Sequence, residues 1–214
     1  MKKLFLLAAS ACLFAVSANA QLRYGPEIGL NVSKFDFDPD MGEESTNIGL
    51  RIGAAMDICI TDHFTIQPGI YYSMRGGESD FTLLGNDVEY NVNLGYIEIP
   101  LLAEYYINAG PGRFFLGLGP TASIAISGKT KTITTTPGGV ESKIEDDIDF
   151  GSDINQLDRS DIGLMFNVGY DFDMGLFIRP FYHMGLSNLS NNSTFDAHNR
   201  TFGVGVGWWF GDDL

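Results

Sequence analysis

Apolar residues alternate with small or polar ones over long stretches of this chain. In the segment TFGVGVGWWF, residues 201–210, bulky apolar residues fill the even positions and glycine fills three of the odd ones. Successive side chains of a β-strand point to opposite faces, so the pattern predicts one apolar face and one nearly bare face. A soluble sheet would carry polar side chains on its second face. The segment therefore favours either a crowded core strand or a membrane-barrel strand whose bare face lines a narrow, filled lumen.

The same alternation recurs in two other segments. Residues 161–172, DIGLMFNVGYDF, depart from it only at Met165, and residues 47–60, NIGLRIGAAMDICI, carry small or polar residues at the odd positions. Both segments are longer than the usual globular strand of about five or six residues. Long strands that are apolar along one whole face are typical of a tilted membrane crossing.

Eight strands are expected in all, and they differ sharply in how they are connected. They cover residues 23–33, 47–60, 64–76, 88–107, 113–128, 159–172, 175–188 and 200–210. Tight turns at residues 61–63, 108–112 and 173–174 alternate strictly with long polar loops at residues 34–46, 77–87, 129–158 and 189–199. The pattern predicts an all-β fold, an eight-stranded antiparallel up-and-down transmembrane β-barrel. Its short turns and both termini would face the periplasm, and its four long loops would be extracellular.

Aromatic residues and prolines refine this prediction. Aromatic side chains gather near the predicted strand ends, where a barrel has its interfacial girdles. They are Phe64, Tyr72, Tyr90, Tyr106, Phe114, Tyr170, Phe172, Trp208 and Phe210. Prolines inside predicted strands remove hydrogen-bond donors from the ladder, and we expect β-bulges to accommodate them. They are Pro26, Pro68, Pro100, Pro120 and Pro180.

The first 20 residues have the organisation of a secretory signal peptide. Lys2 and Lys3 precede an apolar run over residues 4–16, and Ala18-Asn19-Ala20 follows as a small-residue cleavage triplet. We expect cleavage between Ala20 and Gln21, which leaves residues 21–214 as a single outer-membrane β-barrel domain. A lipid anchor at Cys12 is the less favoured alternative, because the apolar run before it is short. After cleavage Cys59 is the only cysteine, so no intramolecular disulfide is expected.

The charge of the chain is strongly acidic. Two of the 13 basic residues lie in the leader whereas all 27 acidic residues follow it, so the processed chain carries a net charge of about −16. This balance argues against a nucleic-acid partner.

If the apolar faces meet lipid, strand parity directs a set of charged residues inward. These are Glu27, Arg51, Asp57, Arg75, Glu98, Glu104, Asp161, Arg179 and His183. The expected lipid-facing residues of the last strand are Val204, Val206, Trp208 and Phe210. A lumen of eight strands is just wide enough to be filled by side chains, so the charges are expected to pair as a structural network. A gated proton or ion path through the same residues is the alternative.

Other candidate sites are weaker. Ser193, Asp196 and His198 are close in sequence, but a catalytic triad is recognised by geometry and not by sequence proximity, so we interpret them as part of a hydrophilic loop. His63 is expected to be a solvated turn residue. The carboxylates of residues 129–158 lack the ligand spacing of a calcium loop and are interpreted as solvated. No catalytic site, cofactor or metal site is therefore predicted.

Several segments carry a resemblance to a known family. They are NLGYIEIPLLAEYYI (residues 93–107), FFLGLGPTAS (114–123), RSDIGLMFNVGYDF (159–172), YHMGLSNLSNNS (182–193) and NRTFGVGVGWWF (199–210). In this order they resemble the outer-membrane protein β-barrel domain family, also labelled PorT-like or porin family protein. In that family a segment like Tyr96–Pro100 opens a central strand. The end of the chain differs from a common barrel ending, because GDDL follows Phe210.

The resemblance implies an eight-stranded barrel in the cell outer membrane and, for most members, no assigned activity. One branch of the family takes part in a secretion pathway, and no feature marks this chain as a member of that branch. We expect a non-enzymatic protein that acts as a membrane scaffold or through its extracellular loops. Expected partners are outer-membrane lipids, the barrel-assembly machinery during biogenesis, and an extracellular or secretion partner. The alternatives are a small porin, a lipid-modifying enzyme, a secretion-pathway accessory barrel and a soluble periplasmic β-protein.

Overall fold

The computed structural model describes residues 22–38, 45–83, 85–151, 153, 156–191 and 196–211. The leader, the predicted cleavage site at Ala20 and Gln21, and Ser193 lie outside the described residues. Within the described ranges, no helix has the length and hydropathy needed for a membrane span.

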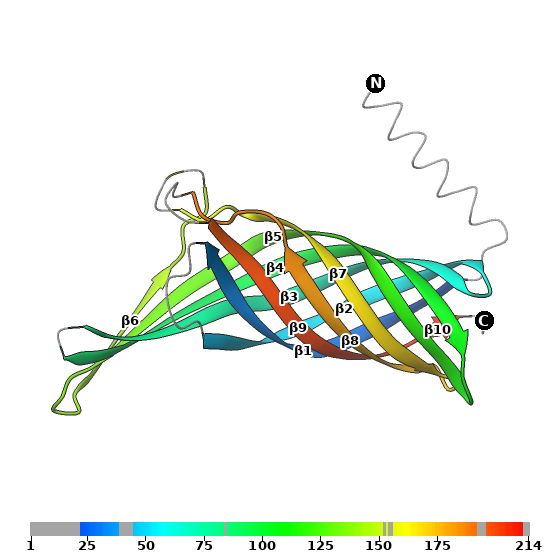
Figure 1. Ribbon diagram of the computed structural model, residues 1–214, viewed down its shortest axis with the longest axis horizontal. Coiled ribbons are helices and arrows are strands. Elements are labelled where there is room, and N and C mark those ends of the chain that lie inside the picture. The colour runs from blue at the N-terminus through cyan, green and yellow to red at the C-terminus, as the bar shows by residue number, and fades with distance from the viewer. Residues whose placement is uncertain are drawn as a thin grey trace, which may run out of the picture.

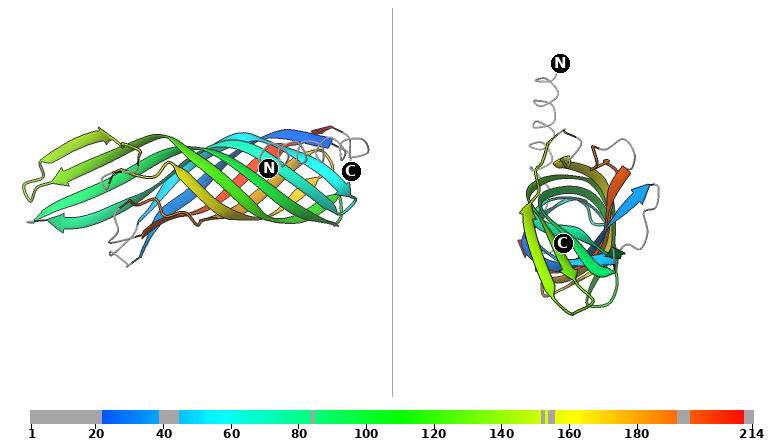
Figure 2. Two further views of the ribbon diagram at one scale, coloured as in Figure 1. Left: turned by 90° about the horizontal axis from the view of Figure 1, so that it is seen from above. Right: turned by 90° about the vertical axis from the view of Figure 1, so that its left-hand side faces the viewer.

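Eight antiparallel strands close into a ring (Figure 1). In chain order they are β1 (Leu22–Asp38), β2 (Ser45–Thr61), β3 (Phe64–Leu83), β4 (Asn86–Asn108), β5 (Gly112–Thr135), β7 (Ser160–Phe172), β8 (Leu176–Gly185) and β9 (Asp196–Trp208). The ring is closed by pairing of β1 with β9, from Glu27 opposite Gly207 to Asp38 opposite Asp196. Viewed along its length, the barrel is a closed tube (Figure 2). The predicted eight-stranded up-and-down barrel is confirmed.

Two further strands lie outside this ring. β6 (Glu141–Asp147) pairs with β5, and β10 (Phe210–Gly211) pairs with the start of β1. The last predicted strand is thus divided at Trp209, whose side chain is buried. The start of β1 and the end of β10 lie at the same end of the barrel as the tight turns (Figure 1).

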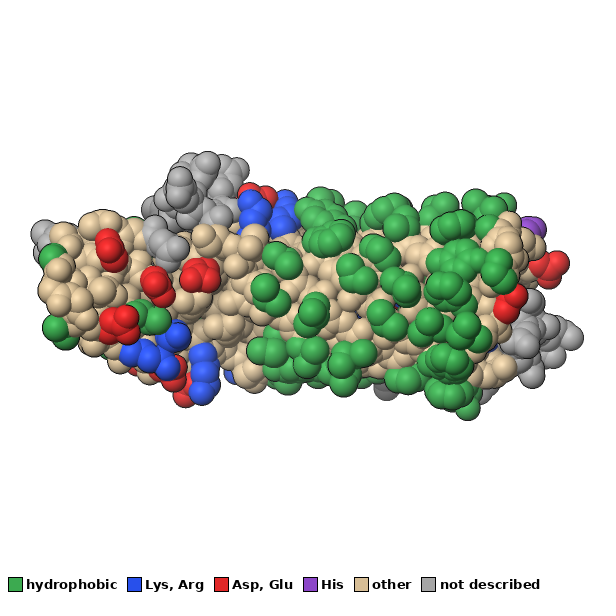
Figure 3. Space-filling model, turned by 90° about the horizontal axis from the view of Figure 1, so that it is seen from below, with side chains coloured by type: hydrophobic (Ala, Val, Ile, Leu, Met, Phe, Trp, Pro, Cys, Tyr) green, Lys and Arg blue, Asp and Glu red, His purple; other side chains and the backbone are tan. Residues whose placement is uncertain are grey.

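The outer surface of the ring is apolar where the strands meet lipid. Along β9 the even-numbered side chains are exposed or partly exposed, as for Val204, which is 40% exposed, and the odd-numbered residues face inward. Val206, Trp208 and Phe210 lie on the same outer face. On its visible face, the barrel carries a band of apolar side chains, and charged side chains gather beyond both ends of the band (Figure 3). This distribution matches the apolar belt of an outer-membrane barrel.

Much of two predicted loops, at residues 77–87 and 129–158, is in fact strand. The β3–β4 pairing continues to Leu83 opposite Asn86, and the β5–β6 hairpin extends to Thr135 opposite Glu141. We call the resulting four-stranded extension (residues 77–83, 86–94, 128–135 and 141–147) the projecting sheet; it extends well beyond the barrel (Figure 2). The sequence prediction failed because the outward positions become polar there, while residues such as Thr130 and Thr132 keep a high β-propensity. The loops predicted at residues 34–46 and 189–199 are also shorter, since β1 reaches Asp38 and β9 starts at Asp196.

The prolines are not accommodated by bulges, contrary to the prediction. The prolines each keep a partner on one neighbouring strand, while the pairing with the other strand is skipped at the proline and resumes in the same register. They are Pro26, Pro68, Pro100, Pro120 and Pro180. In an antiparallel ladder the N–H and C=O of one residue point to the same neighbour, so a proline removes a donor on one side only. The register shifts lie elsewhere, next to Thr46, Cys59 and Gly95.

Two of the aromatic residues assigned to the girdles lie elsewhere. Tyr106 is 1% exposed and points into the barrel. Tyr90 belongs to the projecting sheet, where it pairs with Ser79 and Thr132. Both errors arise because proximity to a strand end does not specify the face or the height of a side chain.

Candidate functional site

The centre of the barrel interior is built around Glu27 of β1. Its carboxylate lies 2.7 Å from Arg51 Nη1 of β2 and 2.8 Å from Arg179 Nη1 of β8. Tyr71 of β3 donates its hydroxyl to Glu27 Oε2 at 2.9 Å, and the Arg51 guanidinium lies 3.3 Å from the centre of the Tyr71 ring. Each of these side chains is almost fully buried. Strands that are far apart in the sequence are thus tied together across the lumen.

Toward the extracellular end the same chain of charges continues. Arg51 pairs with Glu98 of β4 at 3.0 Å, and Glu98 also pairs with Arg75 of β3. Arg75 Nη1 lies 3.2 Å from Asp161 Oδ2 of β7, which accepts a hydrogen bond from Asn199 of β9 at 2.9 Å. Arginines and carboxylates therefore alternate, so that each buried charge has an opposite neighbour.

Toward the periplasmic end, hydrogen-bonded polar side chains connect two carboxylates. Gln67 Nε2 of β3 donates to Asp57 Oδ1 at 2.7 Å and to Glu104 Oε2 at 3.0 Å. Asn167 donates to Glu104 Oε1 at 2.7 Å, and the Tyr106 hydroxyl lies between the two carboxylates. Arg179 Nη2 is 3.8 Å from Glu104 Oε1, which joins this group to the central one.

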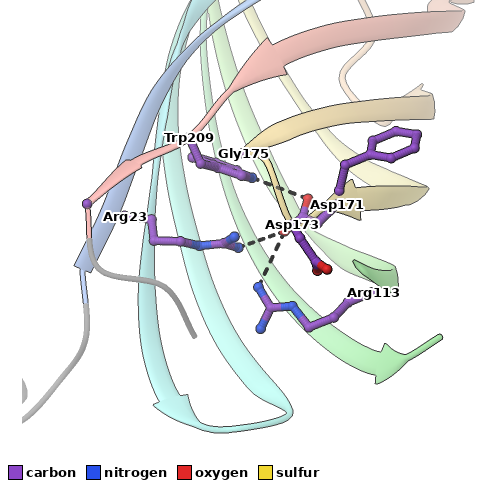
Figure 4. Close-up of a pocket in the computed structure, with 8 residues that line it drawn as sticks. Arg23, Arg113, Asp171, Asp173, Gly175 and Trp209 are labelled. Carbon is purple, nitrogen blue, oxygen red and sulfur yellow. Dashed lines mark hydrogen bonds and ion pairs between the residues drawn. The ribbon is translucent and has the colours of Figure 1, made fainter. Parts of the chain in front are cut away.

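The periplasmic mouth is closed by a second arginine cluster. Arg23 lies 2.5 Å from Asp57 and 2.8 Å from Asp171, and Arg113 lies 3.5 Å from the same Asp171 oxygen. Figure 4 shows Arg23, Arg113 and Trp209 directed toward Asp171; the Trp209 indole N–H donates to it at 3.3 Å. The cavity beside them has a volume of about 190 Å³. The ion-paired side chains of Arg23, Arg113 and Asp171 line this cavity.

The extracellular end of the interior is covered by apolar side chains. Phe35, Leu94, Tyr96, Ala125 and Leu189 form a buried cluster, against which Val92, Ile148, Phe150 and Leu157 pack. The segment leading into β7 and the segment that follows β8 meet at this end, with Asp158 N donating to the Leu189 carbonyl at 3.0 Å. The charged interior is therefore enclosed between this apolar cap and the arginine cluster of the mouth.

The structure brings together eight of the nine residues expected in the lumen, and His183 lies beside them. His183 is buried and hydrogen-bonds Thr121 through Nε2 at 2.8 Å. The sequence prediction missed Arg23, Gln67, Tyr71, Tyr106, Asn167 and Asp171. Parity could have identified all six, because each shares the inward face of β1, β3, β4 or β7 with a residue that was assigned to the lumen.

Asp196 and His198, which were interpreted as part of a hydrophilic loop, each hydrogen-bond to a different residue. Asp196 accepts a hydrogen bond from Asn188 at 2.5 Å, whereas His198 Nδ1 contacts the Ser187 carbonyl at 3.0 Å. His63 lies exposed in its turn, and its Nδ1 is 3.1 Å from the Tyr106 carbonyl. These contacts give each side chain a separate local partner.

The acidic stretch is largely part of the β5–β6 hairpin. Lys143 Nζ lies 2.5 Å from Glu145 Oε1, and this hydrogen bond lowers the pKa of the Glu145 carboxyl. In the register of the sheet, Lys129 is opposite Asp147 and Lys131 is opposite Glu145. Among the residues that the structure describes, no three His, Cys, Asp or Glu side chains are grouped so as to hold a metal ion.

The glycines of GVGVG make room for two kinds of interior side chain. A Cβ at Gly205 would lie 2.2 Å from Glu27 Oε1, whereas a Cβ at Gly203 would meet the Phe181 ring at 2.4 Å. A Cβ at Gly207 would meet the Phe177 ring at 2.2 Å and the Pro26 carbonyl oxygen at 2.4 Å. The bare face of β9 is thus occupied by side chains from neighbouring strands, aromatic as well as charged.

Gly207→Ala is expected to lower the free energy of unfolding by about 1–3 kcal/mol, because the backbone carbonyl of Pro26 cannot move aside without disturbing the β1 ladder. Urea titration of the refolded barrel measures the change. Gly138→Ala is the matched control, since its Cβ would find its nearest neighbour at 3.9 Å. Equal stability of the two variants would contradict the tight packing at Gly207.

Three solved structures are similar to this chain. The solved outer membrane protein OprG from Pseudomonas aeruginosa is 13% identical, covering 90% of this chain and 97% of that chain, with a TM-score of 0.50. Ail, the attachment invasion locus protein of Yersinia pestis, is 16% identical over 89% of this chain and 99% of that chain, with a TM-score of 0.42. Neisserial surface protein A is 12% identical over 87% of this chain and 97% of that chain, with a TM-score of 0.44. The OprG likeness shows the fold alone.

A family model identifies the chain more directly. No curated protein matches the sequence. The model described as outer membrane protein beta-barrel domain matches residues 14–191, which is most of the chain. The protein therefore belongs to the outer membrane protein beta-barrel domain family and is located in the cell outer membrane.

Proposed function

We propose that this protein is a non-enzymatic, closed barrel that holds the projecting sheet at the cell surface for contact with an extracellular partner. The observation that carries the proposal is the filled interior. Ion pairs link Arg113 at the periplasmic mouth to Asp57, and Glu104 to Asp161 below the apolar cap. A lumen packed in this way supports a rigid anchor rather than a conduit.

The edge of the projecting sheet supports a binding role. In the described part of the chain β6 pairs with β5 alone, and all of its residues from Glu141 to Asp147 are exposed. A strand at an edge presents N–H and C=O groups that another strand can bind. β6 carries four carboxylates and one lysine, so a basic extended segment of a protein partner complements it.

The two faces of the projecting sheet differ in chemistry. One face carries Lys129 and Lys131 with Asp147 and Glu145 of β6. The other carries Thr130, Thr132 and Thr134 beside Val92, Tyr90 and Val88 of β4, with Asp146 opposite Thr130. The charged face continues the lipid-facing side of the barrel, so its charges hold it above the apolar belt. The sheet is therefore suited to the aqueous side of the membrane.

Single-channel recording of the refolded mature protein in a planar bilayer tests the closed interior. We expect a folded, inserted barrel without steady openings, with heat-dependent gel mobility confirming that the barrel has formed. Steady openings whose conductance changes when Arg51 or Glu98 is neutralised would instead support a small porin.

Shortening the hairpin tests the role of the projecting sheet. Replacing residues 131–145 by Asn-Gly joins the paired residues Thr130 and Asp146 through a two-residue turn. Retention of cells on a surface coated with serum proteins is expected to fall several-fold, with gel mobility unchanged. Equal retention of cells that carry the unmodified protein and cells that carry the shortened one would contradict binding through β6.

A further inference from the structure

Two cations lie side by side on the outer surface of the barrel, where the apolar belt ends at the extracellular side. Lys34 of β1 and Arg200 of β9 are directly opposite each other in the register that closes the ring. On the same face, the next pair toward the membrane centre is Val32 with Phe202, both of which are exposed on the lipid-facing side. Strand parity places Lys34 and Arg200 on the same outer face. Their height is that of the outer-leaflet head groups.

A cavity of about 380 Å³ lies between these cations and the belt. Val32, Tyr182 and Phe202 contribute its apolar part, while Lys34, Asp36 and Arg200 contribute its charged rim. A ligand that fits such a site has an apolar body and an anionic head. Both features belong to a phosphorylated lipid.

The Arg200 guanidinium is held in place before any ligand arrives. Its Nη1 donates to the Gly185 carbonyl at 2.7 Å, and its Nη2 lies 3.1 Å from Asp36 Oδ2. Arg200 remains partly exposed, and Asp36 is about half exposed. A guanidinium that is already oriented loses little freedom when it binds a phosphate, and lysine supplies a second positive charge.

We propose that Lys34 and Arg200 bind the phosphate of an outer-leaflet lipid whose apolar part occupies the cavity beside Phe202. The surrounding chemistry supports this choice of ligand. The chain is strongly acidic overall, so two adjacent cations at the membrane interface are an exception to its net negative charge. Basic residues at that height attract anionic lipid head groups. The site holds one lipid at the β1–β9 seam, independently of what the projecting sheet binds.

Native mass spectrometry of the full mature protein in an uncharged sugar detergent tests the site. The probe is dimyristoyl phosphatidic acid, and dimyristoylglycerol supplies the same acyl chains without phosphate. We expect one tightly bound phosphatidic acid per barrel and weaker binding of the diacylglycerol. Lys34→Gln and Arg200→Gln should each weaken phosphatidic acid binding about tenfold, because each removes a charge-assisted contact to the phosphate.

Three comparisons keep the proposal falsifiable. Lys129→Gln, in the projecting sheet, is the matched control and should bind as the unmodified protein does. Because Arg200 also bonds a backbone carbonyl, Lys34→Gln provides a separate test if Arg200→Gln fails to fold. Unchanged binding in Lys34→Gln would overturn the proposal. Equal affinity for inorganic phosphate would also overturn it, because the site would then recognise a free anion and not a lipid.

Discussion

Glu27→Gln is expected to lower the free energy of unfolding of the refolded barrel by about 3–5 kcal/mol. Glu27 lies within 2.8 Å of both Arg51 and Arg179 and is 3% exposed. The substitution keeps the size of the side chain and removes the charge that both guanidiniums face. Breaking a buried ion pair on one side leaves uncompensated charge in a medium that solvates it poorly. Urea titration in lipid vesicles, followed by gel mobility, measures the loss.

The control for this prediction is the same substitution at an exposed glutamate. Glu141 lies at the start of β6 and is exposed, so Glu141→Gln should change stability by less than about 0.5 kcal/mol. If Glu27→Gln unfolded at the same urea concentration as the unmodified protein, the ion pairs of the interior would not be what holds the strands together.

Val204→Lys is expected to lower the free energy of unfolding in a bilayer by about 2–4 kcal/mol. Val204 lies on the outer face of β9, opposite Leu30 of β1 and Pro180 of β8, within the apolar belt. A lysine there places an ammonium group in hydrocarbon, where no water or counter-charge solvates it. Urea titration of the barrel refolded into vesicles reports the difference.

Val140→Lys supplies the matched control, since it makes the same chemical change in the turn between β5 and β6. Val140 is 67% exposed and lies at the far end of the projecting sheet. The orientation of the barrel predicts that this variant folds and inserts normally. Equal tolerance of lysine at both positions would mean that the β9 outer face does not meet lipid.

Aromatic rings and ion-paired charges lie next to one another in the barrel interior. Tyr71 and Phe181 both lie against the Arg51 guanidinium, at 3.3 and 4.7 Å from their ring centres, so aromatic rings occupy volume next to the charges. Rings in these positions reduce the space for water and leave the guanidinium to its carboxylate partners. Charge pairing and aromatic packing together account for the stability of a narrow polar lumen.

The alternation of apolar with small or polar residues in the sequence determined the faces of the strands and most of the barrel topology. The face on which Val204 or Glu27 lies depends only on the two-residue period of a strand, which any stretch of sequence displays directly. Strand number, antiparallel order and the periplasmic position of the tight turns followed from the same period and from the lengths of the connections. For this reason the ring was predictable even though no pair of strands could be placed in register.

Only the tertiary structure decided which side chains become partners and how far the strands extend, because both depend on the register between strands. Arg23 meets Asp171 from a distance of 148 residues along the chain, and which arginine faces which carboxylate follows from the stagger of strands around the ring. The one-sided interruptions at the prolines and the length of the projecting sheet likewise depend on neighbouring strands. Parity assigns each residue a face, whereas only closure of the ring gives it a partner, because partners come from strands whose pairing the local sequence does not encode.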